Sequence, residues 1–161
     1  MKLAFTTTIN NKPTLFVKKI WKGLLDMGVI TELELLILFI YPYSSKFRTW
    51  HDNPEDEHID HPKLHTLREN KQNRWKQGKE IEFVINQQTD NEFQFAPTLP
   101  VTSVQKVEII DNEVYVDDRR LQLFEITKLA KNDGFENVAE FFKYFGPNYT
   151  GTIIHWTNLT Y

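Results

Sequence analysis

The sequence contains no cysteine among its 161 residues. Disulfide bonds, thiolate metal sites and cysteine nucleophiles are therefore excluded. Hydrophobic residues are not scarce, because they make up 40% of the chain, and 14% of it is aromatic. This composition is typical of an ordinary globular core, and a chain of this length has room for one such core. We therefore predict a single domain over residues 1–161.

A basic excess is also missing, because the formal net charge is −3. Proteins that coat RNA or DNA by neutralising phosphates usually carry a clear excess of lysine and arginine. The charge therefore argues against a protein that coats nucleic acid along its length. It leaves room for a local basic site that binds one or a few nucleotides.

Long apolar runs and an export signal are absent as well. The first residues, 1–8, lack the apolar stretch of a secretory signal. The longest apolar run, residues 33–41, is interrupted by Glu34 and is too short to span a bilayer. We therefore expect a cytoplasmic protein that does not contact the membrane.

The N-terminal part, residues 1–50, is predicted to be helical after a short strand. Apolar residues at helical spacing predict one helix between Pro13, which suits a first turn, and Gly28, which suits a C-terminal stop. Thr31 followed by Glu34 predicts a capping box for a second helix. We expect Pro42 to end that helix.

The sequence pattern of the remainder of the chain mainly predicts short strands. Residues 51–62 are polar and acidic and are predicted to form a loop. Residues 63–161 are predicted to form the core. We expect strands at 81–85, 101–110, 114–116 and 152–156, with a turn at Asp111-Asn112. We expect a helix at 138–145 that is capped by Asn137. This pattern predicts a mixed α+β domain with a small barrel or a strongly curved sheet.

A basic and aromatic segment, residues 63–78, is the first candidate site. If it is extended, Lys63 and His65 face one way and Thr66 and Arg68 the other, so a turn is needed to bring Lys63 and Thr66 together. Cations beside the ring of Trp75 suit a phosphate with a stacked base. The alternative is a solvated, charged loop.

A histidine cluster among acidic residues is the second candidate. Imidazole and carboxylate groups are suitable ligands for zinc and other transition metals. The spacing matches no metal-ligand signature, so we predict no metal and no cofactor. The histidines concerned are His51, His58, His61 and His65.

Two further positions have both a structural and a functional interpretation. Asp133 precedes Gly134 in a turn pattern, and its carboxylate either caps a helix or acts as a base or ligand for an amine. His155 and Trp156 lie in the last predicted strand. They either line a pocket or belong to the core.

The order and separation of two segments resemble the ASCH family, a branch of the PUA-like superfamily. The first is Lys63-Leu64-His65-Thr66-Leu67-Arg68 with Arg74-Trp75-Lys76-Gln77-Gly78, and the second runs from Leu129 through Asp133-Gly134-Phe135 to Phe141. The resemblance implies a small mixed PUA-like β-barrel with flanking helices and a cleft beside it. Residues 1–50 are then an extra N-terminal helical region.

The resemblance also implies a ligand, namely RNA or a modified nucleotide or nucleoside. In the binding interpretation Arg68, His65, Arg74 and Trp75 contact this ligand. In the alternative, the chain is an amidohydrolase that removes an acyl group from a nucleobase such as N4-acetylcytidine. Thr66 would then be the nucleophile, Lys63 its base and Asp133 the carboxylate. The family has a glutamate there, which is one methylene longer.

Overall fold

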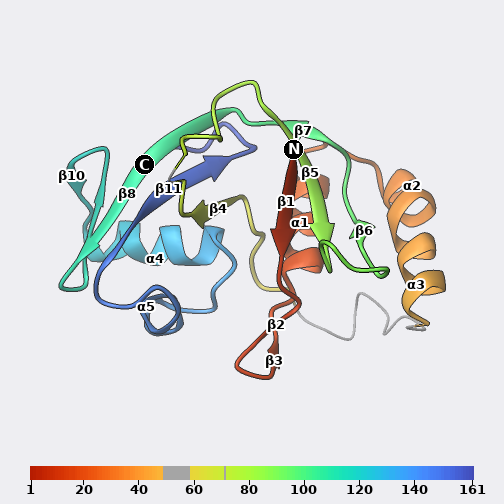
Figure 1. Cartoon of the computed structure of the whole chain (residues 1–161), viewed down its shortest axis with the longest axis horizontal. Helices are drawn as coiled ribbons and strands as arrows, with labels where there is room; N and C mark the ends of the chain where they lie inside the picture. Colours follow the sequence, from red (N-terminus) through yellow and green to blue (C-terminus); the bar gives the residue numbers. More distant parts are fainter. Residues whose placement is uncertain (49–58, 71) are drawn as a thin grey trace. The chain divides into compact units, whose positions relative to one another are not determined.

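The computed structural model describes residues 1–48, 59–70 and 72–161. They form a mixed α+β structure, which confirms the predicted class (Figure 1). The chain divides into two compact units, one made of Met1–Pro62 and Glu82–Thr98 and the other of Lys63–Ile81 and Leu99–Tyr161. That the whole chain is a single domain stays a prediction. Most of the predicted acidic loop lies outside the described residues.

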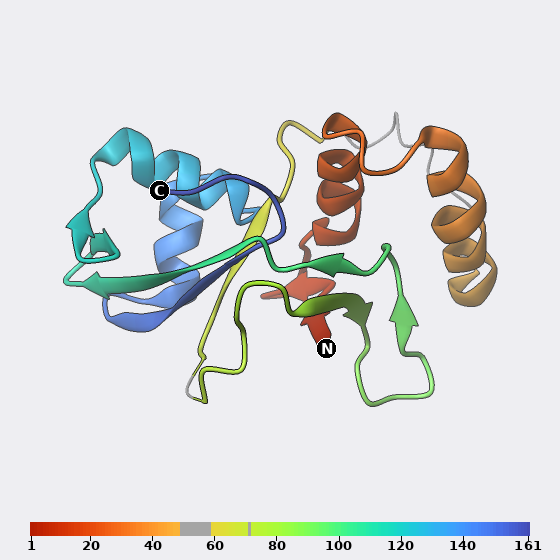
Figure 2. The same cartoon turned by 90° about the horizontal axis from the view of Figure 1, so that it is seen from above.

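The first unit contains a short sheet around β5 (Glu80–Ile85). In this sheet β1 (Lys2–Phe5) runs parallel to β5, and β6 (Phe93–Gln94) runs antiparallel to it. Helix α1 (Phe16–Asp26) covers one face of these strands (Figure 2). The ring of Phe5 lies 6.0 Å from that of Phe83 and 5.7 Å from that of Phe95, so aromatic packing forms the centre of this core.

The predicted start of α1 is wrong by three residues. Pro13 lies in β3 (Lys12–Pro13), which pairs with β2 (Thr8–Ile9) around an Asn10–Asn11 turn with φ of 51° and 60°. Asparagine tolerates this left-handed backbone, which two-residue hairpins require. The predicted stop is confirmed, because Gly28 N–H bonds Leu25 O and Val29 N–H bonds Leu24 O in a Schellman motif.

A longer helical segment follows, made of α2 (Glu32–Leu35), a π-helical stretch η1 (Leu36–Ile40) and α3 (Tyr41–Phe47). The predicted capping box is confirmed, because Glu34 N–H donates to Thr31 Oγ1 over 3.2 Å and Thr31 N–H to Glu34 Oε2 over 2.9 Å. The prediction that Pro42 ends the helix is wrong. A proline ring clashes with the carbonyl four residues earlier, and the π-helical stretch changes the hydrogen-bond pattern just there.

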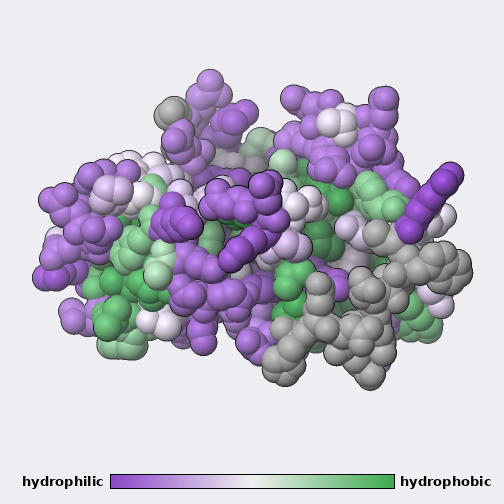
Figure 3. Space-filling view, turned by 90° about the horizontal axis from the view of Figure 1, so that it is seen from below, coloured by the Kyte–Doolittle hydropathy of each residue, from purple (hydrophilic) through white to green (hydrophobic). Residues whose placement is uncertain are grey.

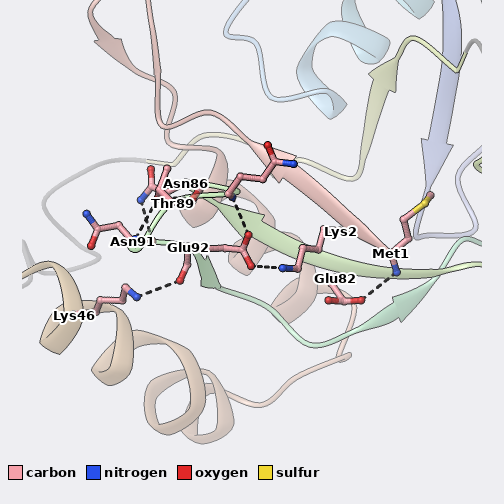
Figure 4. Close-up of polar contacts among 9 residues, drawn as sticks. Met1, Lys2, Lys46, Glu82, Asn86, Thr89, Asn91 and Glu92 are labelled. Carbon is pink, nitrogen blue, oxygen red and sulfur yellow. Dashed lines mark hydrogen bonds and ion pairs between the residues drawn. The ribbon is translucent and has the colours of Figure 1, made fainter.

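Polar contacts tie the strands of the first unit together at its surface (Figure 4). The carboxylate of Glu92 accepts from Lys2 Nζ, and the Met1 ammonium lies 3.2 Å from Glu82 Oε1. Lys46 Nζ donates to the Glu92 carbonyl over 3.2 Å. Water and salt screen exposed pairs of this kind, so they orient these side chains more than they stabilise the unit.

The second unit contains a five-stranded antiparallel sheet of order β10-β9-β8-β11-β4. Its strands are β4 (His65–Arg68), β8 (Ser103–Ile110), β9 (Glu113–Val116), β10 (Arg119–Arg120) and β11 (Tyr149–His155). Helices α4 (Leu123–Asn132) and α5 (Val138–Phe145) lie on one side of it (Figures 1 and 2). A short strand, β7 (Leu99–Pro100), pairs with the start of β5.

Most of the elements predicted for this unit are confirmed. The turn between β8 and β9 lies at Asp111 and Asn112, with φ of 49° and 66°. Helix α5 begins behind Asn137, whose Oδ1 accepts from Glu140 N–H over 2.9 Å. The alternation along β8 buries one face of the sheet, whereas the last three residues of β11 are all buried. That core includes Val107, Val114, Val116, Leu129, Phe141 and Ile153.

The described strands do not close into a barrel. The outermost strands of the five-stranded sheet, β10 and β4, each have one neighbour and do not pair with each other. The α+β class is thus established for the described part of the chain, whereas the PUA-like barrel is not.

The surface carries scattered apolar side chains. Figure 3 shows hydrophobic groups among hydrophilic ones on one face of the molecule. The largest exposed ones include Leu33, Ile37, Leu38, Tyr41, Leu123 and Phe124. Such exposure is common on globular proteins and carries no functional inference by itself. Among the described residues, no helix has both the length and the apolar content needed to cross a bilayer.

Candidate functional site

A buried ion pair joins the two segments that carry the candidate residues. Lys63 Nζ lies 2.7 Å from Asp133 Oδ1, and the side chains are 1% and 3% exposed. Lys63 Nζ also donates to the backbone carbonyl of Asp133. The same Oδ1 accepts from Leu67 N–H over 3.1 Å. The lysine and the β4 backbone therefore both hold one oxygen of this carboxylate.

The local backbone explains why Asp133 reaches β4. Asp133 is the residue after the last turn of α4, and its N–H bonds Leu129 O over 3.0 Å. The chain turns at Gly134, whose φ of 94° favours glycine. Leu64 N–H donates to Asn132 O over 2.8 Å, so the end of α4 is fixed along the outermost strand. Asp133 thus ends a helix and also contacts Lys63.

Burial controls the electrostatics of this carboxylate. Loss of water raises the pKa of Asp133 above its ordinary value of 3.8, and the positive charge of Lys63 opposes this rise most strongly. The positive charge of Arg68 also lowers the pKa of Asp133, by less than that of Lys63. A carboxylate with a perturbed pKa and specific cationic neighbours is typical of a functional site, although structural ion pairs share this property.

A second group of polar side chains surrounds His65 on the same face of the sheet. His65 Nδ1 lies 3.7 Å from Asp133 Oδ1, and His65 Nε2 lies 2.8 Å from the hydroxyl of Tyr161. That hydroxyl accepts from Asn132 Nδ2 over 2.8 Å. His155 pairs with His65 across β4 and β11, with ring centroids 5.3 Å apart. The ion pair and this group form one buried polar cluster.

Both histidine rings in the cluster are held in the neutral form. Burial lowers the pKa of His65 well below its ordinary value, and His155 and Lys63 lower it further. Burial lowers the pKa of His155 to about 4, against the smaller opposing effect of Asp117. Neither ring nitrogen of His155 has a hydrogen-bond partner among the described residues.

Thr66 follows the cluster residue His65 on β4 but is not bonded to the ion pair. Its side chain is 3% exposed. Among the described residues, no hydrogen bond reaches the Thr66 hydroxyl or Oδ2 of Asp133. The structure therefore brings Lys63 and Asp133 together but does not link Thr66 to either through a hydrogen bond.

The other sequence-predicted ligand residues differ in exposure. Arg74 is exposed, and its backbone N–H donates to Asn70 Oδ1 over 2.8 Å. Trp75 is 7% exposed, so most of its ring is packed inside the unit. The binding roles of Arg68, His65, Arg74 and Trp75 stay predictions.

Sequence reasoning missed two residues of the cluster. Tyr161 lies 96 positions from His65, a separation that follows no local pattern. Asn132 is adjacent to Asp133, but nothing in its type distinguishes it from a solvated residue.

Of the histidine cluster noted in the sequence, His61 and His65 lie within the described residues. Among the described residues, no group of three or more histidine and acidic side chains is placed to hold a metal ion. His51 and His58 lie outside the described residues.

No family model, curated protein or solved structure matches this chain.

Proposed function

We propose that this chain is an ASCH-type domain of the PUA-like fold that binds nucleic acid or a modified nucleotide at the Lys63–Asp133 cluster. The observation that carries the proposal is the ion pair itself. It joins the two segments on which the family resemblance depends, and they are 70 positions apart in the sequence.

Unused hydrogen-bonding groups support a ligand at this site. Buried polar atoms without a partner are uncommon, and each calls for water, a ligand or another explanation. In the cluster these atoms are His65 Nδ1 and both ring nitrogens of His155. The Thr66 hydroxyl and Asp133 Oδ2 also make no hydrogen bond among the described residues. A hydroxyl can donate or accept, whereas an ionised carboxylate oxygen accepts only, and groups of both kinds suit a nucleobase edge or a ribose hydroxyl.

The state of Lys63 favours binding over catalysis. A lysine base must be deprotonated and must reach the nucleophile that it activates. Here Lys63 Nζ donates to both the carboxylate and the carbonyl of Asp133, so its hydrogens are directed at Asp133. It makes no hydrogen bond to the Thr66 hydroxyl. Because Asp133 neutralises Lys63, phosphate contacts would depend on Arg68 and Arg74.

The amidohydrolase remains a second proposal for one specific reason. Lys63 and Asp133 meet at 2.7 Å, as a catalytic pair would require, and Thr66 is three residues from Lys63. In that mechanism the Thr66 oxygen attacks the acyl carbon, and its proton passes through Lys63 to the leaving amine. Water then hydrolyses the acyl-threonine ester.

The test of binding is an equilibrium titration of short single-stranded RNA at low ionic strength. Thr66→Val removes the hydroxyl and keeps the shape, and we expect it to weaken binding roughly tenfold. Thr127→Val is the matched control, because that exposed hydroxyl bonds only Leu123 O on α4. Equal affinity for all three proteins, or no salt-sensitive binding by the wild type, contradicts the proposal.

The test of catalysis is chromatography of N4-acetylcytidine after incubation with the same three proteins. Release of cytidine by the wild type and Thr127→Val but not by Thr66→Val would support the amidohydrolase. No release at high protein concentration would leave binding as the proposed function.

A further inference from the structure

The hydroxyl of Tyr161 lies between two side chains of the buried cluster. It is 2.8 Å from His65 Nε2 and 2.8 Å from Asn132 Nδ2. The Tyr161 backbone is held by one side chain, because its N–H donates to Gln105 Oε1 over 2.9 Å and its carbonyl accepts from Gln105 Nε2 over 2.9 Å. Gln105 Nε2 also donates to Asp117 Oδ2 over 2.9 Å. The hydroxyl is thus positioned from β8 as well as from the cluster.

The direction of these hydrogen bonds indicates where the hydroxyl hydrogen of Tyr161 and the ring hydrogen of His65 lie. The amide nitrogen of Asn132 can only donate, so the Tyr161 oxygen accepts from it. Among the described residues, His65 Nε2 is the acceptor within hydrogen-bond distance of the hydroxyl hydrogen, so the arrangement that uses this hydrogen leaves Nε2 unprotonated. A neutral imidazole with a bare Nε2 carries its hydrogen on Nδ1.

The other side of the ring agrees with this assignment. His65 Nδ1 lies 3.7 Å from Asp133 Oδ1. An N–H directed at a carboxylate is attracted, whereas a nitrogen lone pair in that position is repelled. Burial keeps the His65 ring neutral by lowering its pKa. The ring therefore carries one hydrogen, on either Nδ1 or Nε2.

We propose that Tyr161 is a positioning residue of the ligand site, because its hydroxyl selects the His65 tautomer whose Nδ1–H faces Asp133. The inference rests on the proposed function for its effect on binding. Lys63 Nζ and Leu67 N–H donate hydrogen bonds to Oδ1 of Asp133, and with this tautomer the His65 Nδ1–H lies 3.7 Å from the same oxygen, beyond hydrogen-bond distance. The second oxygen, Oδ2, is left to accept a hydrogen from a ligand N–H or O–H group.

Nitrogen-15 NMR of the histidine side chains tests the tautomer without any ligand. In the wild type we expect a protonated Nδ1 and a bare Nε2 for His65, identified as the signal lost in His65→Gln. In Asn132→Asp the carboxylate accepts the Tyr161 hydrogen, so the hydroxyl must accept from His65 and the tautomer should reverse. A wild-type ring protonated on Nε2, or an unchanged tautomer in Asn132→Asp, overturns the inference.

Titration of short single-stranded RNA tests the consequence for the site. Tyr161→Phe removes only the hydroxyl, and we expect about three- to tenfold weaker binding together with a changed His65 spectrum. An altered spectrum with unchanged affinity overturns the positioning role. Absence of RNA binding by the wild type contradicts the proposed function, whereas the NMR result still decides the tautomer.

Discussion

Lys63 Nζ and Asp133 Oδ1 lie 2.7 Å apart with both side chains almost fully buried. A charge in this environment depends on its partner, because neither group can be solvated by water. Breaking such a pair by removing one partner costs about 3–5 kcal/mol, whereas removing both charges costs far less.

Replacing the lysine should therefore strongly destabilise the protein. Lys63→Met keeps the apolar stem and leaves the carboxylate of Asp133 buried without its cation. We expect the free energy of unfolding, measured with urea, to fall by about 3–5 kcal/mol at neutral pH. In Lys63→Met with Asp133→Asn no charge stays buried, so most of the loss should be recovered. Additive losses in the double variant would show that the two groups do not interact.

The neutral histidines predict a loss of stability in mild acid. The folded-state pKa of His155 is lowered from 6.5 to about 4, so between these values the unfolded chain binds more protons. Stability is therefore fully present above pH 6.5 and falls as the pH decreases toward 4. For His155 alone the loss between pH 7 and pH 5 is about 2 kcal/mol. His65 changes stability in the same direction, because its pKa is also lowered.

A variant that lacks the His155 imidazole separates the contribution of His155 to this pH dependence from the contributions of other titrating groups. In His155→Phe we expect the difference in unfolding free energy between pH 7 and pH 5 to shrink. The ring nitrogens of His155 have no hydrogen-bond partner among the described residues, so replacing the ring by phenylalanine leaves no other polar group without its partner. An unchanged pH dependence in this variant would contradict the assignment to His155.

Arg74 offers a test of phosphate contact that does not disturb the buried cluster. It is exposed, so Arg74→Gln should leave stability unchanged. On the proposed function, RNA affinity should fall for all sequences, and the slope of log K against log salt should become shallower by about 0.7. Arg119→Gln is a suitable control, because Arg119 is also exposed and pairs with Glu125. An equal slope in wild type and Arg74→Gln would exclude a phosphate contact at Arg74.

The sequence predicted local structure better than it predicted the connections within the site. Apolar spacing and caps located α5, and asparagine and aspartate located the turn between β8 and β9, because these signals act over a few residues. The alternation rule also separated Lys63 from Thr66 on an extended strand, and the structure has no hydrogen bond between them. Pro42 was misjudged because a π-helical stretch relieves the usual clash of a proline within a helix.

The cluster around His65 could not be assembled from sequence in the same way. Its contacts to Tyr161 and Asp133 depend on how β4, β11 and the end of α4 pack together. The family resemblance suggested Lys63 and Asp133 as partners, but it gave no indication of Asn132 or Tyr161. Tertiary hydrogen bonds between distant residues leave no periodic signal.

The contact of Asp133 with the backbone of β4 has a consequence for self-association. An outermost strand with unpaired N–H groups is a template onto which a strand of another molecule can add. On β4 the Leu67 N–H is taken by Asp133 Oδ1, and just before the strand the Leu64 N–H is taken by Asn132 O. The same carboxylate that organises the candidate site therefore also shields this edge of the sheet, and weakening it would favour aggregation by edge-to-edge pairing.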